Sequence, residues 1–285
     1  MKVSAIYKES VAQLTPILGA GEAESSISIL LEDAFGISRL DRLMQPNTEL
    51  SAADLSRLQS AIQRLANHEP VQHIIGFCYF LGRRYKVSPD TLVPRPETEE
   101  LVMHIVENYR TAHEPIKILD VGSGSGCIAI SLDLLIQQAE VTGWDISPKA
   151  LEIARHNALN LDSSASFELK DALKDLPFRS LDIIVSNPPY IPEKEQLEMH
   201  KNVTDFDPPL ALFVPDHDPL LFYRAIGQMG RKTLVAGGKL FFEIHENFGP
   251  ETRDLLASMG YQEVEIRLDL QGKDRIVAAT NPPRP

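Results

Sequence analysis

From residue 116 to the C-terminus, the chain alternates short apolar segments with longer segments of helical periodicity. The apolar segments predict strands at 116–121, 140–144, 165–169, 181–186 and 239–244. Such alternation is typical of a parallel sheet covered by helices on both faces. Two further segments, 264–268 and 275–280, flank a short polar turn and predict a closing antiparallel pair. We therefore expect a doubly wound α/β fold with a seven-stranded sheet whose last hairpin is antiparallel.

A glycine-rich loop, Gly122-Ser123-Gly124-Ser125-Gly126, follows the first predicted strand and precedes a predicted helix. Its glycines permit a tight turn and allow a ligand to approach the backbone closely. The second predicted strand ends at Asp145, about 20 residues beyond the loop, where an acidic side chain usually binds a ribose diol. The loop and Asp145 therefore predict a nucleotide-type ligand at the carboxyl ends of the strands, where open α/β sheets bind ligands.

The spacing of the loop bears on which ligand is bound, NAD or S-adenosylmethionine. The NAD fingerprint requires Gly or Ala at position 127, where this chain has Cys127. Asp120, just before the loop, suits a ligand that carries a positive ammonium or sulfonium group. Asp171 follows the third predicted strand and Asn187 the fourth, so both are expected at the same edge of the sheet. We favour S-adenosylmethionine, and an NAD-dependent oxidoreductase is the weaker alternative.

The fourth predicted strand is followed by Asn187-Pro188-Pro189-Tyr190. Two successive prolines cannot donate hydrogen bonds to a sheet, so the strand must end there. Alone, the motif is better explained as a strand stop with a buried tyrosine, but the upstream loop favours a functional role. The Asn187 amide and the Pro188 carbonyl offer two acceptors for the hydrogens of a planar NH2 group, and Tyr190 can cover its face. This predicts methyl transfer to an amide or exocyclic amine nitrogen, catalysed by positioning and oriented dipoles rather than by an ionised base.

The chain before the sheet divides into two segments. Residues 1–74 show helical spacing without a convincing strand, which predicts a small all-α domain. Residues 75–95 predict a β-hairpin linker. The α/β domain is expected to span 96–285, and Glu97 or Thr98 to cap its first helix.

The composition limits the partners of the chain. Its 285 residues carry a formal net charge of −12, which argues against general nucleic-acid binding. No apolar run approaches the length of a membrane span, and the N-terminus lacks a secretion signal. Cys78 and Cys127 are far apart, and the eight histidines show no ligand spacing. We expect no metal, a reducing, cytoplasmic location, and a monomer without membrane partners or a stable nucleic-acid complex.

Over nearly its whole length, the sequence resembles the HemK/PrmC family of protein-(glutamine-N5) methyltransferases, which are class I S-adenosylmethionine-dependent enzymes. The resemblance covers the helical domain and the segments 69–76, 93–99, 120–126, 145–147, 186–191 and 243–244. Asn-Pro-Pro-Tyr alone is shared with DNA adenine and other amine methyltransferases. The Pro-Arg-Pro-Glu-Thr-Glu segment joined to this helical domain is far more specific.

The resemblance implies a substrate, the glutamine of the Gly-Gly-Gln loop in bacterial class I peptide chain release factors. It implies that the helical domain and the hairpin help to dock that protein. It further implies that the 187–190 motif binds the glutamine, with Pro189 part of that site. Asp120, the glycine loop, Asp145 and Asp171 would bind the cofactor, and Ala172 stands where some members place an aromatic ring against the adenine.

Two other functions compete with this interpretation. An N6-adenine or N2-guanine methyltransferase acting on nucleic acid would use the same amine-holding motif on a flipped base. The acidic composition counts against it. A non-catalytic, cofactor-binding regulator is also conceivable, but an eroded loop or strand-end motif would then be expected, and both are intact.

Overall fold

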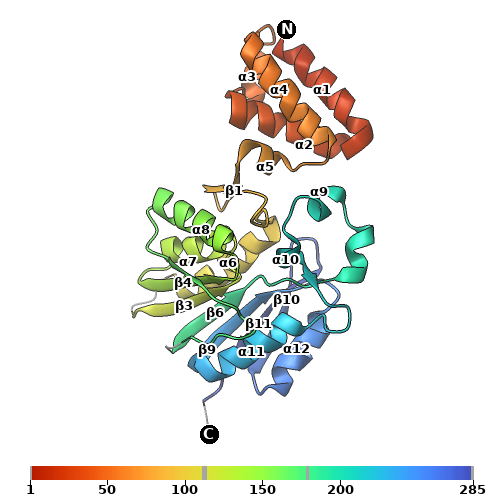
Figure 1. The fold of residues 1–285 in the computed structure, drawn as a ribbon. Coiled ribbons are helices and arrows are strands. Elements are labelled where there is room, and N and C mark those ends of the chain that lie inside the picture. Colours follow the sequence, from red (N-terminus) through yellow and green to blue (C-terminus); the bar gives the residue numbers. More distant parts are fainter. Residues whose placement is uncertain (1, 111–113, 178–179, 284–285) are drawn as a thin grey trace. The chain divides into compact units, whose positions relative to one another are not determined.

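The C-terminal part of the chain forms a seven-stranded sheet in the order β10-β11-β9-β6-β3-β4-β5 (Figure 1). The computed structural model describes residues 2–110, 114–177 and 180–283. The strands are Ile116–Val121 (β3), Ala139–Asp145 (β4), Ser166–Leu169 (β5), Leu181–Ser186 (β6), Leu234–Glu243 (β9), Gln262–Leu268 (β10) and Asp274–Thr280 (β11). β11 runs antiparallel to β9 and β10, and the other neighbours are parallel. The predicted fold class is confirmed.

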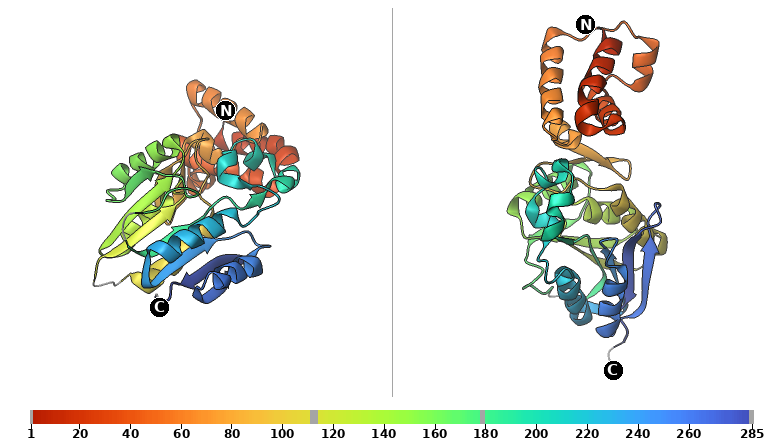
Figure 2. Two further views of the ribbon diagram at one scale, coloured as in Figure 1. Left: turned by 60° about the horizontal axis from the view of Figure 1, so that its bottom comes forward. Right: turned by 90° about the vertical axis from the view of Figure 1, so that its right-hand side faces the viewer.

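Helices cover both faces of this sheet (Figure 2). They are Pro96–Tyr109 (α6), Cys127–Leu135 (α7) and Pro148–Asn160 (α8) on one face, and Leu221–Thr233 (α11) and Gly249–Ser258 (α12) on the other. Along β3, Ile118 packs into the core under α6, α7 and α8, whereas Leu119 and Val121 pack into the core under α11 and α12. Successive side chains of a strand point to opposite faces, so one strand contributes to both cores.

A short β-hairpin precedes the sheet, formed by Phe77–Phe80 (β1) and Arg83–Lys86 (β2). The buried Tyr85 of β2 shares a hydrogen bond of 2.9 Å with the Ser131 hydroxyl on α7. Asn157 on α8 accepts from the Lys86 amide and donates to the Lys86 and Ser125 carbonyls. These bonds fix the second hairpin strand to the glycine loop through one buried amide.

The chain divides into two units, Met1–Phe77 with His200–Phe206, and Cys78–Met199 with Asp207–Pro285. The first is helical, with Val3–Leu18 (α1), Ala20–Ile29 (α2), Leu30–Ala34 (η1), Arg39–Met44 (α3), Ala52–Ala66 (α4), Val71–Ile75 (α5) and Lys201–Thr204 (α9). Leu14, Ile27 and Leu31 are fully buried in its core. Ser51 caps α4, because its hydroxyl accepts from the Asp54 amide at 3.1 Å.

Between β6 and α11 the chain forms short elements: Ile191–Pro192 (β7), Glu193–Glu198 (η2), α9, Pro209–Leu212 (α10) and Phe213–Val214 (β8). β7 and β8 pair in parallel, away from the main sheet. Within the described residues, none of the helices combines the length and the apolar character that crossing a membrane requires.

Gly143, in the middle of β4, supports the site by its lack of a side chain. A Cβ at this position would lie 2.6 Å from the Phe167 ring and 3.0 Å from Ser123 in the glycine loop. Because the ring is buried and cannot move freely, Gly143→Ala is expected to lower the free energy of unfolding by about 2 kcal/mol. Thermal and urea denaturation measure this change.

The matched control is Gly21→Ala in α2, where a Cβ would meet nothing within 4 Å. Alanine is favoured over glycine inside a helix, so this variant should be at least as stable as the parent protein. Equal stability of both variants would contradict the proposed crowding at Gly143.

Candidate active site

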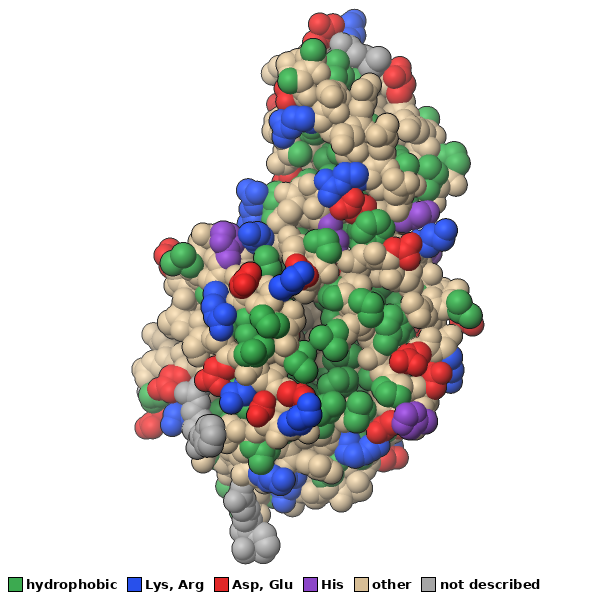
Figure 3. All heavy atoms as spheres, in the orientation of Figure 1, with side chains coloured by type: hydrophobic (Ala, Val, Ile, Leu, Met, Phe, Trp, Pro, Cys, Tyr) green, Lys and Arg blue, Asp and Glu red, His purple; other side chains and the backbone are tan. Residues whose placement is uncertain are grey.

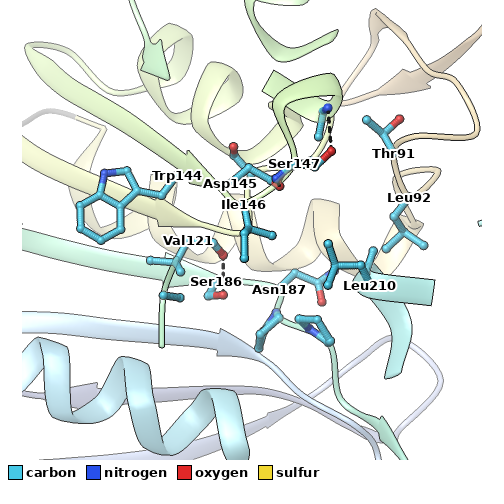
Figure 4. A pocket seen from close by; sticks show the side chains of 18 of the residues that line it. Thr91, Leu92, Val121, Trp144, Asp145, Ile146, Ser147, Ser186, Asn187 and Leu210 are labelled. Atoms are coloured by element: carbon cyan, nitrogen blue, oxygen red, sulfur yellow. Dashed lines mark hydrogen bonds between the residues drawn. The ribbon is translucent and has the colours of Figure 1, made fainter. Parts of the chain in front are cut away.

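A cavity of about 310 Å³ lies at the carboxyl ends of β3, β4 and β6, within the α/β unit (Figure 4). Most of the residues singled out from the sequence line it: Gly122, Ser123, Gly124, Ser125, Asp145, Asp171, Ala172, Asn187, Pro188 and Pro189. Ile146, Leu173 and Leu210 also line it and are exposed, and hydrophobic side chains gather on this face of the unit (Figure 3). Asp120, Gly126 and Tyr190 are not among the residues that line this cavity.

The glycine loop carries the chain sharply from β3 into α7. Gly126 has φ +81°, and a Cβ there would lie about 3 Å from the side chains of Ile130, Phe167 and Ala154. At Gly124, φ is +53° and a Cβ would meet nothing within 4 Å. L side chains rarely adopt such angles. The end of the loop therefore needs glycine for packing, whereas its middle leaves the backbone open to a ligand.

Asp145 holds the loop in place from the end of β4. One carboxylate oxygen accepts from the Gly124 amide at 2.8 Å and the other from the Ser147 amide at 2.8 Å. Burial raises the pKa of Asp145, while these two backbone hydrogen bonds act in the opposite direction. Each oxygen keeps a further lone pair. The carboxylate can thus support the loop and still accept hydrogen bonds from a ligand.

Asp120 lies beneath the loop and is completely buried. Its Oδ2 accepts from the Ala129 amide in the first turn of α7 at 3.2 Å, and its Oδ1 has no hydrogen-bond partner among the described residues. Burial raises its pKa to about 8. The side chain therefore braces the start of α7, and its predicted contact with a positively charged ligand stays a prediction.

Asp171 belongs to a turn after β5 at the cavity wall. Its carboxylate pairs with Lys174 at 2.7 Å and accepts from the Leu173 amide, and the bond to Lys174 lowers its pKa most. Ala172 is half-buried and packs against the core under α11 and α12. The carboxylate is thus engaged in its own turn, while Ala172 presents a small apolar surface to the cavity.

Behind the cavity, a chain of hydrogen bonds joins Asn187 to a buried carboxylate. Asn187 Nδ2 donates to Thr98 Oγ1 at 3.3 Å, and Thr98 Oγ1 donates to Glu243 Oε2 at 2.7 Å. Tyr190 donates its phenolic hydrogen to Glu243 Oε1 at 3.2 Å. Thr98 and Glu243 are 2% and 1% exposed, so water hardly reaches this network.

This network was not found from the sequence. Thr98 is expected to cap α6, as is Glu97, but the cap position is Arg95 and no side chain caps the helix there. Both expectations are wrong, because the helix begins at Pro96 and both residues therefore lie inside its first turn. Thr98 instead points to Glu243, the last residue of β9. Glu243 carried a signal, since it lies near the carboxyl end of the strand predicted at 239–244, but no pattern in the sequence links it to Thr98.

The chemistry of the cavity fits S-adenosylmethionine. Its wall combines the Asp145 carboxylate and the open backbone of the loop with apolar side chains such as Trp144. The Ser123 hydroxyl lines the cavity, is buried and has no hydrogen-bond partner among the described residues. A polar group of a ligand would satisfy it. Within residues 2–110, 114–177 and 180–283, no cluster of His, Cys, Asp or Glu is arranged to hold a metal ion.

Known proteins resemble the chain over nearly its whole length. Residues 8–76 match the PrmC N-terminal domain and residues 97–205 the methyltransferase small domain. A release factor glutamine methyltransferase from Bacteroides thetaiotaomicron is 42% identical over 98% of this chain and 99% of its own. One from Flavobacterium psychrophilum is 40% identical over 94% and 95%. A methyltransferase structure from Pyrococcus furiosus has a TM-score of 0.53 at 14% identity, covering 82% of this chain and 100% of that one, which supports the fold.

The sheet order, the glycine loop and the cavity at the strand ends are those of an S-adenosylmethionine-dependent methyltransferase. This class contains many families. The two release factor glutamine methyltransferases align with this chain over nearly the whole length of both proteins, which identifies the family. The chain belongs to the release factor glutamine methyltransferase family. The resemblance to the HemK/PrmC family is thereby confirmed.

Proposed function

We propose that this protein methylates the side-chain amide nitrogen (N5) of the glutamine in the Gly-Gly-Gln loop of bacterial class I peptide chain release factors. The observation that carries the proposal is the orientation of Asn187 beside the cofactor cavity. Its Nδ2 is engaged with Thr98, which leaves Oδ1 as the atom that can accept from a substrate NH2 group. The names of the relatives, release factor glutamine methyltransferase, agree with such a substrate.

The proposed roles in catalysis follow from the chemistry of a primary amide. Its nitrogen is a poor nucleophile, because its lone pair is delocalised into the carbonyl group. Asn187 Oδ1 and the Pro188 carbonyl accept the two N–H groups, which fixes the amide and directs the lone pair to one face. Pro189, which lines the cavity, packs against the amide plane, while Tyr190 supports the motif through its hydrogen bond to Glu243. These groups act by positioning and by fixed dipoles. One N–H proton leaves after the methyl group has passed from the sulfonium to the nitrogen, so no general base is assigned.

S-adenosylmethionine supplies a methyl group activated by the sulfonium. Asp145 accepts from the ribose hydroxyls, while the loop Gly122–Gly126, with the Ser123 hydroxyl, cradles the remainder of the ligand. Asp171 and Ala172 border the adenine. Asp120 braces the start of α7 from below, and its carboxyl group is the proposed contact for the positively charged amino-acid part of the ligand.

The other units have proposed roles in recognition. Residues 1–74 form the docking domain for the release factor, and 75–95 link it to the methyltransferase domain, 96–285. A substrate of the translation machinery places the protein in the cytoplasm. The net charge of −12 favours a protein partner over a stable nucleic-acid complex, and we propose that the protein acts as a monomer.

Mass spectrometry tests the proposed reaction. The purified protein is incubated with S-adenosylmethionine and a bacterial class I release factor, and the tryptic peptide that contains the loop is analysed. We expect one methyl group on the loop glutamine and none when that glutamine is replaced by alanine. Labelled methyl groups in tRNA, rRNA or DNA, with the release factor unmodified, would support the nucleic-acid methyltransferase instead.

A further inference from the structure

Hydrogen bonds link the side chains of Asn187 and Tyr190 to one buried carboxylate, that of Glu243. Glu243 accepts from Thr98 on one oxygen and from Tyr190 on the other. Through Thr98 it also reaches Asn187. The two polar side chains that flank the diproline are therefore anchored to the same buried group, at the end of β9.

The direction of these hydrogen bonds follows from proton counting. Thr98 and Tyr190 both donate to Glu243, whose two carboxylate oxygens act as acceptors. Burial raises the pKa of Glu243, while these two hydrogen bonds and the nearby Arg275 favour its charged form. The Thr98 oxygen then has only lone pairs to offer Asn187, so it accepts from the amide nitrogen. Reversing the Asn187 amide would set its carbonyl oxygen against the Thr98 lone pairs. Nδ2 is thus held inward, and Oδ1 remains for the cavity.

We propose that Thr98 and Glu243 are positioning residues that set the polarity of the amide site and so make the enzyme select a hydrogen-bond donor. This inference rests on the proposed function. A glutamine side chain brings an NH2 group to Asn187 Oδ1 and is accepted. A glutamate carboxylate brings only acceptors and is rejected, because the two sets of lone pairs face each other.

The experiment measures this selection by binding rather than by turnover. Calorimetry gives the Kd of the release factor with its Gly-Gly-Gln loop and of its Gly-Gly-Glu variant, in the presence and absence of S-adenosylhomocysteine. The unchanged enzyme should prefer the glutamine form. Thr98→Val removes the hydroxyl that orients Asn187, and we expect it to reduce that preference about tenfold, the effect of one hydrogen bond to a charged or fixed partner. Thr98→Ser keeps the hydroxyl and should restore the preference.

Thr252→Val is the matched control, since Thr252 is fully buried in α12 and its hydroxyl has no partner among the described residues. It should leave the preference unchanged. If Thr98→Val does not fold, as judged by its melting temperature, Thr98→Ala replaces it. That variant also lacks the hydroxyl that orients Asn187, and the same loss of preference is expected.

The outcomes separate the two proposals. If the parent enzyme neither methylates the release factor nor prefers its glutamine form, the proposed function is overturned. If the parent enzyme methylates the release factor and prefers its glutamine form, and the Thr98→Val variant is equally selective, only the proposed polarity role is overturned. A general loss of affinity for both loop forms, with their ratio preserved, also overturns it, because that result reflects a purely structural role.

Discussion

Replacing Asn187 with alanine is expected to reduce kcat/KM for the release factor by about 100- to 1000-fold, the usual effect of removing one preorganised polar group from an active site. The variant loses the side-chain acceptor that is proposed to bind the substrate amide. Its neighbour Pro188 keeps the backbone acceptor and the diproline keeps its shape. Binding of S-adenosylmethionine should therefore remain within a few-fold of the parent value. Initial rates of methyl transfer and calorimetry of the cofactor measure the two quantities.

The control for this change is Asn108→Ala, an exposed asparagine of α6 whose side chain donates to the His104 carbonyl of its own helix. Its kinetic constants should equal those of the parent protein. Comparable activity of Asn187→Ala would refute the acceptor role. An equal loss of cofactor binding in that variant would show that Asn187 acts by supporting the cavity.

The fold could be predicted from the sequence because its signals are local. Buried parallel strands are short apolar runs, and the residues that end them, such as Asn187-Pro188-Pro189, are adjacent in the chain. One local prediction was less accurate. The expected fifth strand begins at 239, after a turn at Gly237-Gly238, whereas β9 already begins at Leu234. Its pairing with β6 jumps from Leu234 to Lys239, so the glycines lie in an irregular stretch of a longer strand.

The site was predicted only where its residues belong to one continuous motif. The loop 122–126, Asp145 and the 187–190 motif each follow a strand, and parallel strands bring their carboxyl ends to one edge. The Thr98–Glu243 contact joins residues 145 positions apart, from a helix start and a distant strand end. No periodicity or spacing encodes such a pairing, which depends on how α6 packs on the sheet. Burial of Asp120 depends on packing in the same way.

Asp145→Ala is expected to weaken binding of S-adenosylmethionine about 100-fold, because it removes charge-assisted hydrogen bonds to the ligand and from the loop. The Gly124 and Ser147 amides, each 2.8 Å from this carboxylate, both lose their acceptor. The loop then becomes free to move, and ordering it again costs part of the binding energy. Calorimetry with S-adenosylhomocysteine measures the loss without any turnover, and thermal denaturation shows whether the fold persists.

Two further variants separate the contributions that the Asp145 charge and the order of the loop make to cofactor affinity. Asp145→Asn keeps one acceptor oxygen, so it can still bind one of the two amides, and its loss of affinity should be smaller than that of alanine. Asp254→Ala removes an exposed carboxylate of α12 that pairs with the neighbouring Arg253, and this variant should bind the cofactor normally. Unchanged cofactor affinity in Asp145→Ala would mean that the ligand does not contact the end of β4. The cavity would then hold its ligand by the loop and the apolar wall alone.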